Sequence, residues 1–227
     1  MGPGGAALAG LAKLSLGDDA SRNQVLVLGA HCDDIEIGCG ATLVDLAERS
    51  PDLQFHSITF CSDPAREKES RRGLSTLLGE QADLTMDFGG LRDGFLPYRA
   101  EEAKQFLIDK TRGLSPSLIF THSHNDLHQD HRFVCEITRQ VLRDGLVLEM
   151  EIPKYDGDLG RPNIYFPVAQ RAVERKISTL MSCYPSQLKK QWFTEETFEA
   201  MLRLRGLECK ADTGMAEAFY ASKIIMS

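Results

Sequence analysis

Histidines and aspartates, residue types that bind metal ions and move protons, gather in two short segments of this chain. The first is His31-Cys32-Asp33-Asp34, which follows the apolar run Gln24–Gly29. The second follows the apolar run at 117–121 and holds four more of the six histidines, His122, His124, His128 and His131. In open α/β sheets, ligands bind outside the carboxyl ends of the strands. The two segments therefore predict one site.

The first segment sets two carboxylates side by side, where like charges repel each other. One interpretation is that Asp33 or Asp34 caps a helix starting near Glu36, since Asp favours N-cap positions and helix dipoles favour anions there. The other is that a bound cation relieves the repulsion. The segment alone leaves both open.

The second segment supplies further candidate ligands. In Asp126-Leu127-His128-Gln129-Asp130-His131 the two histidines are three residues apart, so a helix beginning here would carry both rings on one face. Neutral imidazole suits Zn²⁺, and three protein ligands with an open fourth position are typical of catalytic zinc. Asp126 and Asp130 are predicted to orient the rings by accepting their other N–H groups. The alternative is a solvated, polar helix start.

Alternating strands and helices must position these segments. Strands are predicted at Gln24–Gly29, Leu53–Cys61, Asp83–Phe88, Ser117–Thr121, Leu146–Ile152 and Ala218–Ile225. Helices are predicted around Leu43–Ala47 and over 64–79, Glu101–Arg112, Asp130–Arg143, Arg171–Ser182 and Glu195–Arg205. This alternation implies right-handed βαβ units, hence an α/β, Rossmann-like, mostly parallel sheet flanked by helices. We expect a loose arm over 1–22 and a single domain over 23–227.

Composition narrows the class of protein. The chain has 227 residues, 42% hydrophobic and 26% charged, as in an ordinary globular protein. With 26 basic against 33 acidic residues the net charge is −7, which argues against nucleic acid as a partner. No apolar run approaches the roughly 18 residues that a membrane helix needs, so no membrane partner is expected. Six scattered cysteines are interpreted as reduced thiols of a cytoplasmic protein.

In order along the chain, the two segments resemble the motifs of the LmbE-like, or PIG-L, zinc-dependent N-deacetylases. The family's first motif is A-H-P-D-D-x-E, and the chain has Ala30-His31-Cys32-Asp33-Asp34-Ile35-Glu36. The second is H-x-D-H, and the chain has His128-Gln129-Asp130-His131. Shorter matches extend the resemblance over most of 24–225; they are Gly38–Leu43, Arg66 with Glu69, Asp93-Gly94 and Ala216–Phe219.

The resemblance implies a role for each matching residue. It makes His31, Asp34 and His131 the zinc ligands, Asp33 the general base, and a protonated His128 the group that stabilises the oxyanion. The implied cofactor is Zn²⁺. Fe²⁺ is possible, because the same two-histidine, one-carboxylate set also binds that ion.

Two further residues are candidates for contact with substrate. Because its helix begins after a strand end, Arg66 would reach substrate hydroxyls or a phosphate; the alternative is a solvated helix face with ion pairs. The resemblance places Asp93 near the sugar, the alternative being a turn residue. Cys32 stands where the family has Pro; we interpret it as a small buried residue, the alternative being a thiolate that competes for zinc. Residues 156–168 form either a mobile lid or an ordinary surface loop.

Together these features predict a metal-dependent hydrolase that removes the N-acetyl group of an amino sugar or related small metabolite and releases acetate. Its partner is that small-molecule substrate, and a homo-oligomer is possible. A hydrolase of another small amide or acyl group is the alternative from the same site. A nucleotide-binding module would need Gly-x-Gly-x-x-Gly after the first strand, where Asp33 and Asp34 would instead repel phosphate.

Overall fold

The computed structural model describes residues 23–222 of the chain. The predicted arm over 1–22 lies outside this range, as do the last residues of the predicted strand Ala218–Ile225. The division of the chain at residue 22 therefore stays a prediction.

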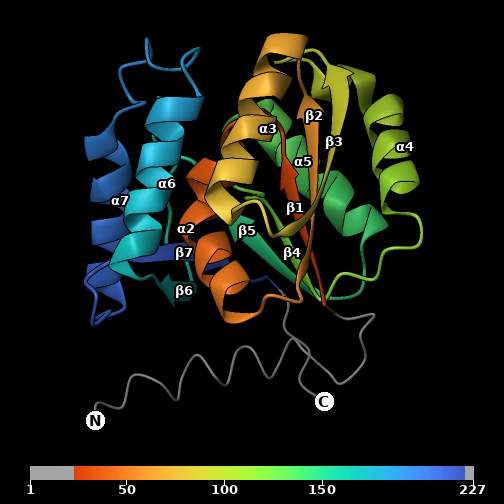
Figure 1. Ribbon diagram of the computed structural model, residues 1–227. Helices are drawn as coiled ribbons and strands as arrows, with labels where there is room; N and C mark the ends of the chain where they lie inside the picture. The colour runs from red at the N-terminus through yellow and green to blue at the C-terminus, as the bar shows by residue number, and fades with distance from the viewer. Residues whose placement is uncertain (1–22, 223–227) are drawn as a thin grey trace.

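Seven strands form one sheet. They are β1 Gln24–Gly29, β2 Gln54–Cys61, β3 Asp83–Leu91, β4 Leu118–His122, β5 Leu146–Met150, β6 Ile164–Pro167 and β7 Ala216–Tyr220. Their order is β3-β2-β1-β4-β5-β7-β6 (Figure 1). Neighbours among β1 to β5 pair in parallel, and β7 runs antiparallel to both β5 and β6. The mostly parallel sheet confirms the predicted α/β class.

Helices connect the strands. They are α2 Asp34–Arg49, α3 Pro64–Leu78, α4 Ala100–Thr111, α5 Gln129–Val141, α6 Gln170–Cys183 and α7 Glu195–Glu208, with a short 3-10 helix at Leu96–Arg99. The helix α2 begins at Asp34, two residues before the start near Glu36 that the capping interpretation gave; Gly38 and Gly40 weaken the helical signal of its first turns, so the apolar pattern is clear only from Leu43. Within the described residues, no helix is long and apolar enough to span a membrane.

The two faces of the sheet carry separate apolar cores. Val25 and Val27 of β1 face one core, and Leu26 and Leu28 face the other. Residues of α2, α3, α6 and α7 complete the first core, and residues of α4 and α5 complete the second. Helices on both faces explain why β1 is apolar throughout.

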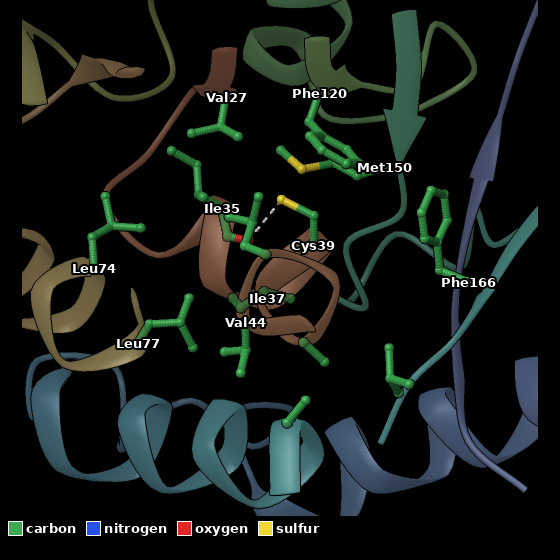
Figure 2. Packing of buried hydrophobic residues seen from close by; sticks show 14 of the residues in the cluster. Val27, Ile35, Ile37, Cys39, Val44, Leu74, Leu77, Phe120, Met150 and Phe166 are labelled. Atoms are coloured by element: carbon green, nitrogen blue, oxygen red, sulfur yellow. Dashed lines mark hydrogen bonds between the residues drawn. The ribbon is translucent and has the colours of Figure 1, made fainter. Parts of the chain in front are cut away.

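The helix α2 packs closely on the sheet, and Figure 2 shows its side chains between the strands and the neighbouring helices. A Cβ atom at Gly38 would come within 2.5 Å of the sulfur of Met150 on β5, so this approach requires glycine. In the same turns Cys39 Sγ donates to the carbonyl of Ile35 at 3.3 Å (Figure 2). The beginning of α2, where Asp34 lies, is thereby fixed against β5.

A buried ion pair anchors α2 from the other side. Glu217 of β7 accepts the backbone N–H groups of Ala41 and Thr42 at 3.0 and 2.7 Å, and Lys176 of α6 donates to it at 2.6 Å. Every partner of this buried carboxylate is a hydrogen-bond donor, which is the condition under which a buried charge is tolerated. The family motif at Ala216–Phe219 therefore has a structural role here, since its Glu217 fixes α2 against the sheet.

Part of the segment predicted to be a lid or loop is a strand. β6 is four residues long and pairs with β7 from Ile164 opposite Phe219 to Pro167 opposite Ala216. It was missed because it is short and carries a proline, which is suited to this edge position because it has no N–H to donate. β7 correspondingly begins at Ala216, ahead of the prediction.

Candidate metal centre and active site

The two predicted segments meet at the centre of the sheet, where β1 and β4 are neighbours. The chain leaves β1 for α2 on one face and leaves β4 for α5 on the other, which creates the crevice where α/β proteins bind ligands. His31 lies just beyond β1, and His122 is the last residue of β4. The backbone N–H of Ala30 donates to His122 Nε2 at 2.9 Å and ties the two strand ends together.

The turn between β1 and α2 is closed by Asp34. Its Oδ2 accepts the backbone N–H of His31 at 2.7 Å, so the two side chains are held close together. Asp33 occupies the N-cap position of α2, but its side chain makes no capping hydrogen bond. The geometry therefore does not support the capping interpretation for Asp33. The carboxylate of Asp33 contacts Arg66 instead, and that of Asp34 contacts His31.

Three donor atoms of the predicted ligands form a compact triangle. His31 Nδ1 lies 3.1 Å from His131 Nε2 and 3.4 Å from Asp34 Oδ2, and His131 Nε2 lies 3.5 Å from the same oxygen. Tetrahedral zinc with bonds of about 2.0–2.1 Å places its donors about 3.3–3.4 Å apart. The spacing and the chemistry of the three donors fit a small divalent cation.

The ring of His131 is held from behind by Asp126, one of the two aspartates expected to orient the histidine rings. His131 Nδ1 lies 2.9 Å from Asp126 Oδ2, and Lys154 Nζ lies 3.0 Å from Asp126 Oδ1. Burial would raise the pKa of Asp126, but its hydrogen bond with His131 and the nearby charges of His131, His122 and Lys154 together hold it below its usual range. Burial, followed by the nearby His122, lowers the pKa of His131 to about 4. His131 is therefore neutral near pH 7 and offers a lone pair.

His31 is held differently. Its Nε2 lies 3.0 Å from Asp93 Oδ1 and 3.3 Å from Asp130 Oδ2. Burial lowers the pKa of His31, but Asp34 and the hydrogen-bonded carboxylates of Asp130 and Asp93 together raise it well above its ordinary value. These acidic surroundings favour a positive charge at this position.

Asp130 lies against the ring of His31 rather than against the rings of its own segment. Its carboxylate also accepts the backbone N–H groups of Gly94 and Leu96 at 2.6 and 3.1 Å. Gly94 has a φ of +79°, a conformation that favours glycine. Asp130 thus positions both His31 and the loop that carries Asp93.

Arg66 contacts the proposed general base rather than open space. Its Nη2 lies 2.7 Å from Asp33 Oδ1. The first turn of α3, which carries Arg66, is fixed by the side chain of Asp63, which accepts the N–H groups of Ala65 and Arg66. Burial raises the pKa of Asp33, the charge of Arg66 opposes this, and that of Asp34 adds to it. The expected contact of Arg66 with substrate stays a prediction.

His128 is the N-cap residue of α5. Its Nδ1 accepts the backbone N–H of Asp130 at 3.3 Å, so the ring proton belongs on Nε2. The sequence suggested a protonated His128, whereas this arrangement provides an N–H donor on a neutral ring. Its ring centre lies 4.9 Å from that of His31 and 4.6 Å from that of His131.

Asp93 and Cys32, two further residues singled out in the sequence, differ in exposure. The side chain of Asp93 is 69% exposed, and its pKa is lowered to about 2, first by its hydrogen bond with His31. The thiol of Cys32 is buried and donates to the carbonyl of Cys61 at 3.6 Å, and burial raises its pKa to about 12. A protonated thiol bonded to the backbone agrees with the interpretation of Cys32 as a small buried residue.

Sequence reasoning gave no role to His122, which the structure places inside the cluster. It is fully buried, its ring stacks on His131 at 3.9 Å between centres, and its Nε2 lies 3.1 Å from Asp34 Oδ2. Asp34, His122 and His131 form a second set of donors close enough to hold a metal ion. The sequence did contain a signal for this role, because His122 is the last residue of the strand that precedes the histidine-rich segment.

Comparisons with known proteins identify the family of this chain. Residues 26–142, just over half of the chain, match the family model PIG-L, described as GlcNAc-PI de-N-acetylase. The chain belongs to the PIG-L family. A relative, the uncharacterized deacetylase YaiS of Escherichia coli K12, is 29% identical in an alignment of length 132 that covers 54% of this chain and 69% of YaiS.

Solved structures share the fold. The conserved protein TT1542 of Thermus thermophilus superposes with a TM-score of 0.71 at 19% identity, covering 89% of this chain and 96% of that one. The N,N'-diacetylchitobiose deacetylase of Pyrococcus horikoshii gives 0.68 at 17%, covering 87% and 82%. GalB, a 4-carboxy-2-hydroxymuconate hydratase from Pseudomonas putida KT2440, gives 0.71 at 17%, covering 90% and 98%. Because a hydratase shares this fold, the reaction must be argued from the site's residues.

Proposed function

We propose that this chain is a metal-dependent deacetylase that removes the N-acetyl group of an amino sugar or a related small metabolite. Water attacks the acetyl carbonyl carbon, the C–N bond breaks, and acetate and a free amine leave. The proposal rests on the triangle of His31 Nδ1, Asp34 Oδ2 and His131 Nε2, whose spacing suits zinc, with Asp33 adjacent in the chain.

His31, Asp34 and His131 would hold the ion. We propose Zn²⁺, because imidazole and carboxylate donors at this spacing suit it, with Fe²⁺ as the alternative for the same donor set. When bound, such an ion polarises a carbonyl oxygen and lowers the pKa of water. The remaining tasks fall to side chains around the triangle.

Asp33 is the proposed general base. Arg66 engages Oδ1, and we assign the proton transfer to Oδ2, which accepts a proton from the attacking water. Burial raises the pKa of Asp33, and a base with a pKa nearer the working pH is more effective. The same oxygen then delivers the proton to the amine nitrogen, so that a neutral amine leaves and Asp33 is ionised again.

His128 is the proposed donor to the oxyanion. Because its Nδ1 accepts the N–H of Asp130, its Nε2–H is available for the carbonyl oxygen. A hydrogen bond to that oxygen strengthens as negative charge develops, so it stabilises the transition state more than the substrate.

An N-acetylated amino sugar is the proposed substrate class. The family description names a GlcNAc derivative, and the Pyrococcus horikoshii structure is that of an N,N'-diacetylchitobiose deacetylase. Within the site, Asp93 is the better candidate for a sugar hydroxyl, because its side chain is largely exposed, whereas Arg66 is engaged with Asp33.

The cellular compartment is proposed from the cysteines. All six are free thiols, and five of them are buried. Free thiols without disulfides are typical of reducing compartments. We therefore propose that the enzyme works in the cytoplasm.

The test is acetate release from a panel of N-acetyl amino sugars by protein that is metal-depleted, then reconstituted with Zn²⁺ or Fe²⁺. We expect equal amounts of acetate and free amine, only with metal present, and a lower melting temperature for the depleted protein, because an ion bound only to the native state stabilises it. Undiminished activity in protein shown to be metal-free would contradict the proposal. Amine released with a different acid would support the alternative acyl hydrolase.

A further inference from the structure

A second group of donor atoms lies on the opposite edge of the His31 ring from the triangle. There His31 Nε2 faces Asp93 Oδ1 at 3.0 Å and Asp130 Oδ2 at 3.3 Å, and the Cys61 thiol donates to Asp130 Oδ2 at 3.8 Å. Ligand atoms of His31, Cys61 and Asp130 all lie within 4.8 Å of one another. The proposed deacetylation gives Cys61 no task.

These donors come from four separate parts of the chain. Cys61 ends β2, Asp130 lies in the first turn of α5, and His31 and Asp93 lie in the loops after β1 and β3. Cys61 and Asp130 are buried, with exposed fractions of 4% and 0%, whereas Asp93 is largely exposed. The group is therefore closed on its inner side and reached from solvent past Asp93.

We propose that His31 Nε2, Cys61 and Asp130, with Asp93 on the open side, form a second metal site for a borderline or soft divalent cation such as Zn²⁺ or Cd²⁺. A mixed nitrogen, sulfur and oxygen set is suited to these ions, and the thiolate favours them over Mg²⁺ or Ca²⁺. Ion binding displaces the proton of the Cys61 thiol, which is released to solvent.

The two sites share one ring. A neutral imidazole has one lone pair, so when Nε2 binds an ion the ring proton must lie on Nδ1. His31 then leaves the triangle, where only Asp34 and His131 remain. An ion at the second site therefore competes with the proposed catalytic ion for His31.

The test is a titration of metal-depleted protein with Cd²⁺ alone, followed through the ultraviolet charge-transfer band of a cadmium–thiolate bond. The wild-type chain should develop the band, and Cys61→Ser should lose it. Cys135→Ser, which removes another buried thiol from α5, is the matched control and should keep it. His131→Ala, which removes a donor of the triangle only, should also keep it.

Absence of the band in the wild-type protein, or an equal band in Cys61→Ser, would overturn the proposal. Loss of the band in His131→Ala would overturn it too, because Cys61 would then serve the triangle. Should Cys61→Ser fail to fold, anomalous diffraction from wild-type crystals soaked in Cd²⁺ decides. The expected peak lies within bonding distance of Cys61 Sγ, and a peak in the triangle alone contradicts the second site.

Discussion

His31 and His131 belong to one proposed metal centre, yet the protein holds their rings in opposite ways. His131 is buried and tied through Nδ1 to Asp126, and its pKa is lowered to about 4. His31 lies among Asp34, Asp93 and Asp130, which raise its pKa well above the ordinary value against the effect of burial. The surroundings of His131 favour a neutral ring, whereas those of His31 favour a protonated one.

This difference assigns separate tasks to the two rings. His131 is a preformed ligand, since its lone pair is free without loss of a proton. His31 carries the proton that an arriving ion must displace, and until then its charge offsets the carboxylates around it. Buried carboxylates without a cation repel one another, so a histidinium at this position stabilises the centre without metal.

Removing the preformed ligand should have the largest effect. His131→Ala should lower zinc affinity by more than the about 10–100-fold that loss of an orienting partner costs, and activity should be lost with the metal. The measurement is zinc per chain after dialysis, with His56→Ala as control, since His56 lies in β2 and has no proposed role. Stoichiometric zinc in His131→Ala would rule this ligand out.

Removing a carboxylate that orients a ligand should lower zinc affinity less than removing the ligand itself, and the loss should differ between Asp126 and Asp93. Asp126→Asn weakens the buried contact that fixes the ring of His131, so zinc affinity should fall about 10–100-fold. Asp93→Asn changes an exposed carboxylate beside His31, where Asp130 remains, and the loss should be smaller. Competition with a chelator of known affinity measures both, and a larger loss in Asp93→Asn would reverse the comparison.

The proton on His31 should make zinc binding depend on pH. Below the raised pKa of His31 the ring must lose a proton to bind, so affinity should rise about tenfold per pH unit and level off above that pKa. His131 is already neutral above about pH 4 and adds no slope near neutrality. Asp93→Asn removes one carboxylate that raises the pKa of His31, so its plateau should begin at lower pH. Calorimetry in buffers of different ionisation enthalpy counts the released proton, and zero released would contradict the assignment.

The smallest expected effect concerns Arg66. Its charge lowers the pKa of Asp33, so Arg66→Met should raise that pKa. A base works only when deprotonated, and the acidic limb of kcat/KM should therefore move to higher pH while zinc content stays unchanged. Arg66→Lys keeps the charge and should move the limb less. A limb that moves to lower pH in Arg66→Met would contradict the pairing of Arg66 with the base.

Local patterns predicted most of the fold. The strands β1 and β4 are apolar runs and β2 has an alternating pattern, and the ends of all three lie within a residue of the prediction. The start of α2 was predicted only through the possible cap at Asp33 or Asp34, because glycines lower helix propensity and the close packing of Gly38 on Met150 is a tertiary contact. β6 was likewise missed, since it exists only through pairing with β7.

The candidate site was predictable in its members but not in its pairings. The residue types and their positions after strands are local, so the histidines and aspartates could be named. Asp130 contacts His31 because the segment between β3 and α4 brings the N–H groups of Gly94 and Leu96 to the same carboxylate. That Arg66 contacts Asp33 depends on how α3 lies beside α2. Such contacts between distant segments leave no periodic pattern in a sequence.

The two neighbouring aspartates, Asp33 and Asp34, allow the most direct test of the proposed centre. Zinc per chain and steady-state acetate release are measured side by side for Asp34→Ala and Asp33→Asn. Asp34→Ala should lose zinc and turnover together. Asp33→Asn should keep zinc while kcat falls about 10²–10⁴-fold, the usual contribution of a general base, with KM little changed. Full zinc in Asp34→Ala, or full kcat in Asp33→Asn, would contradict the account.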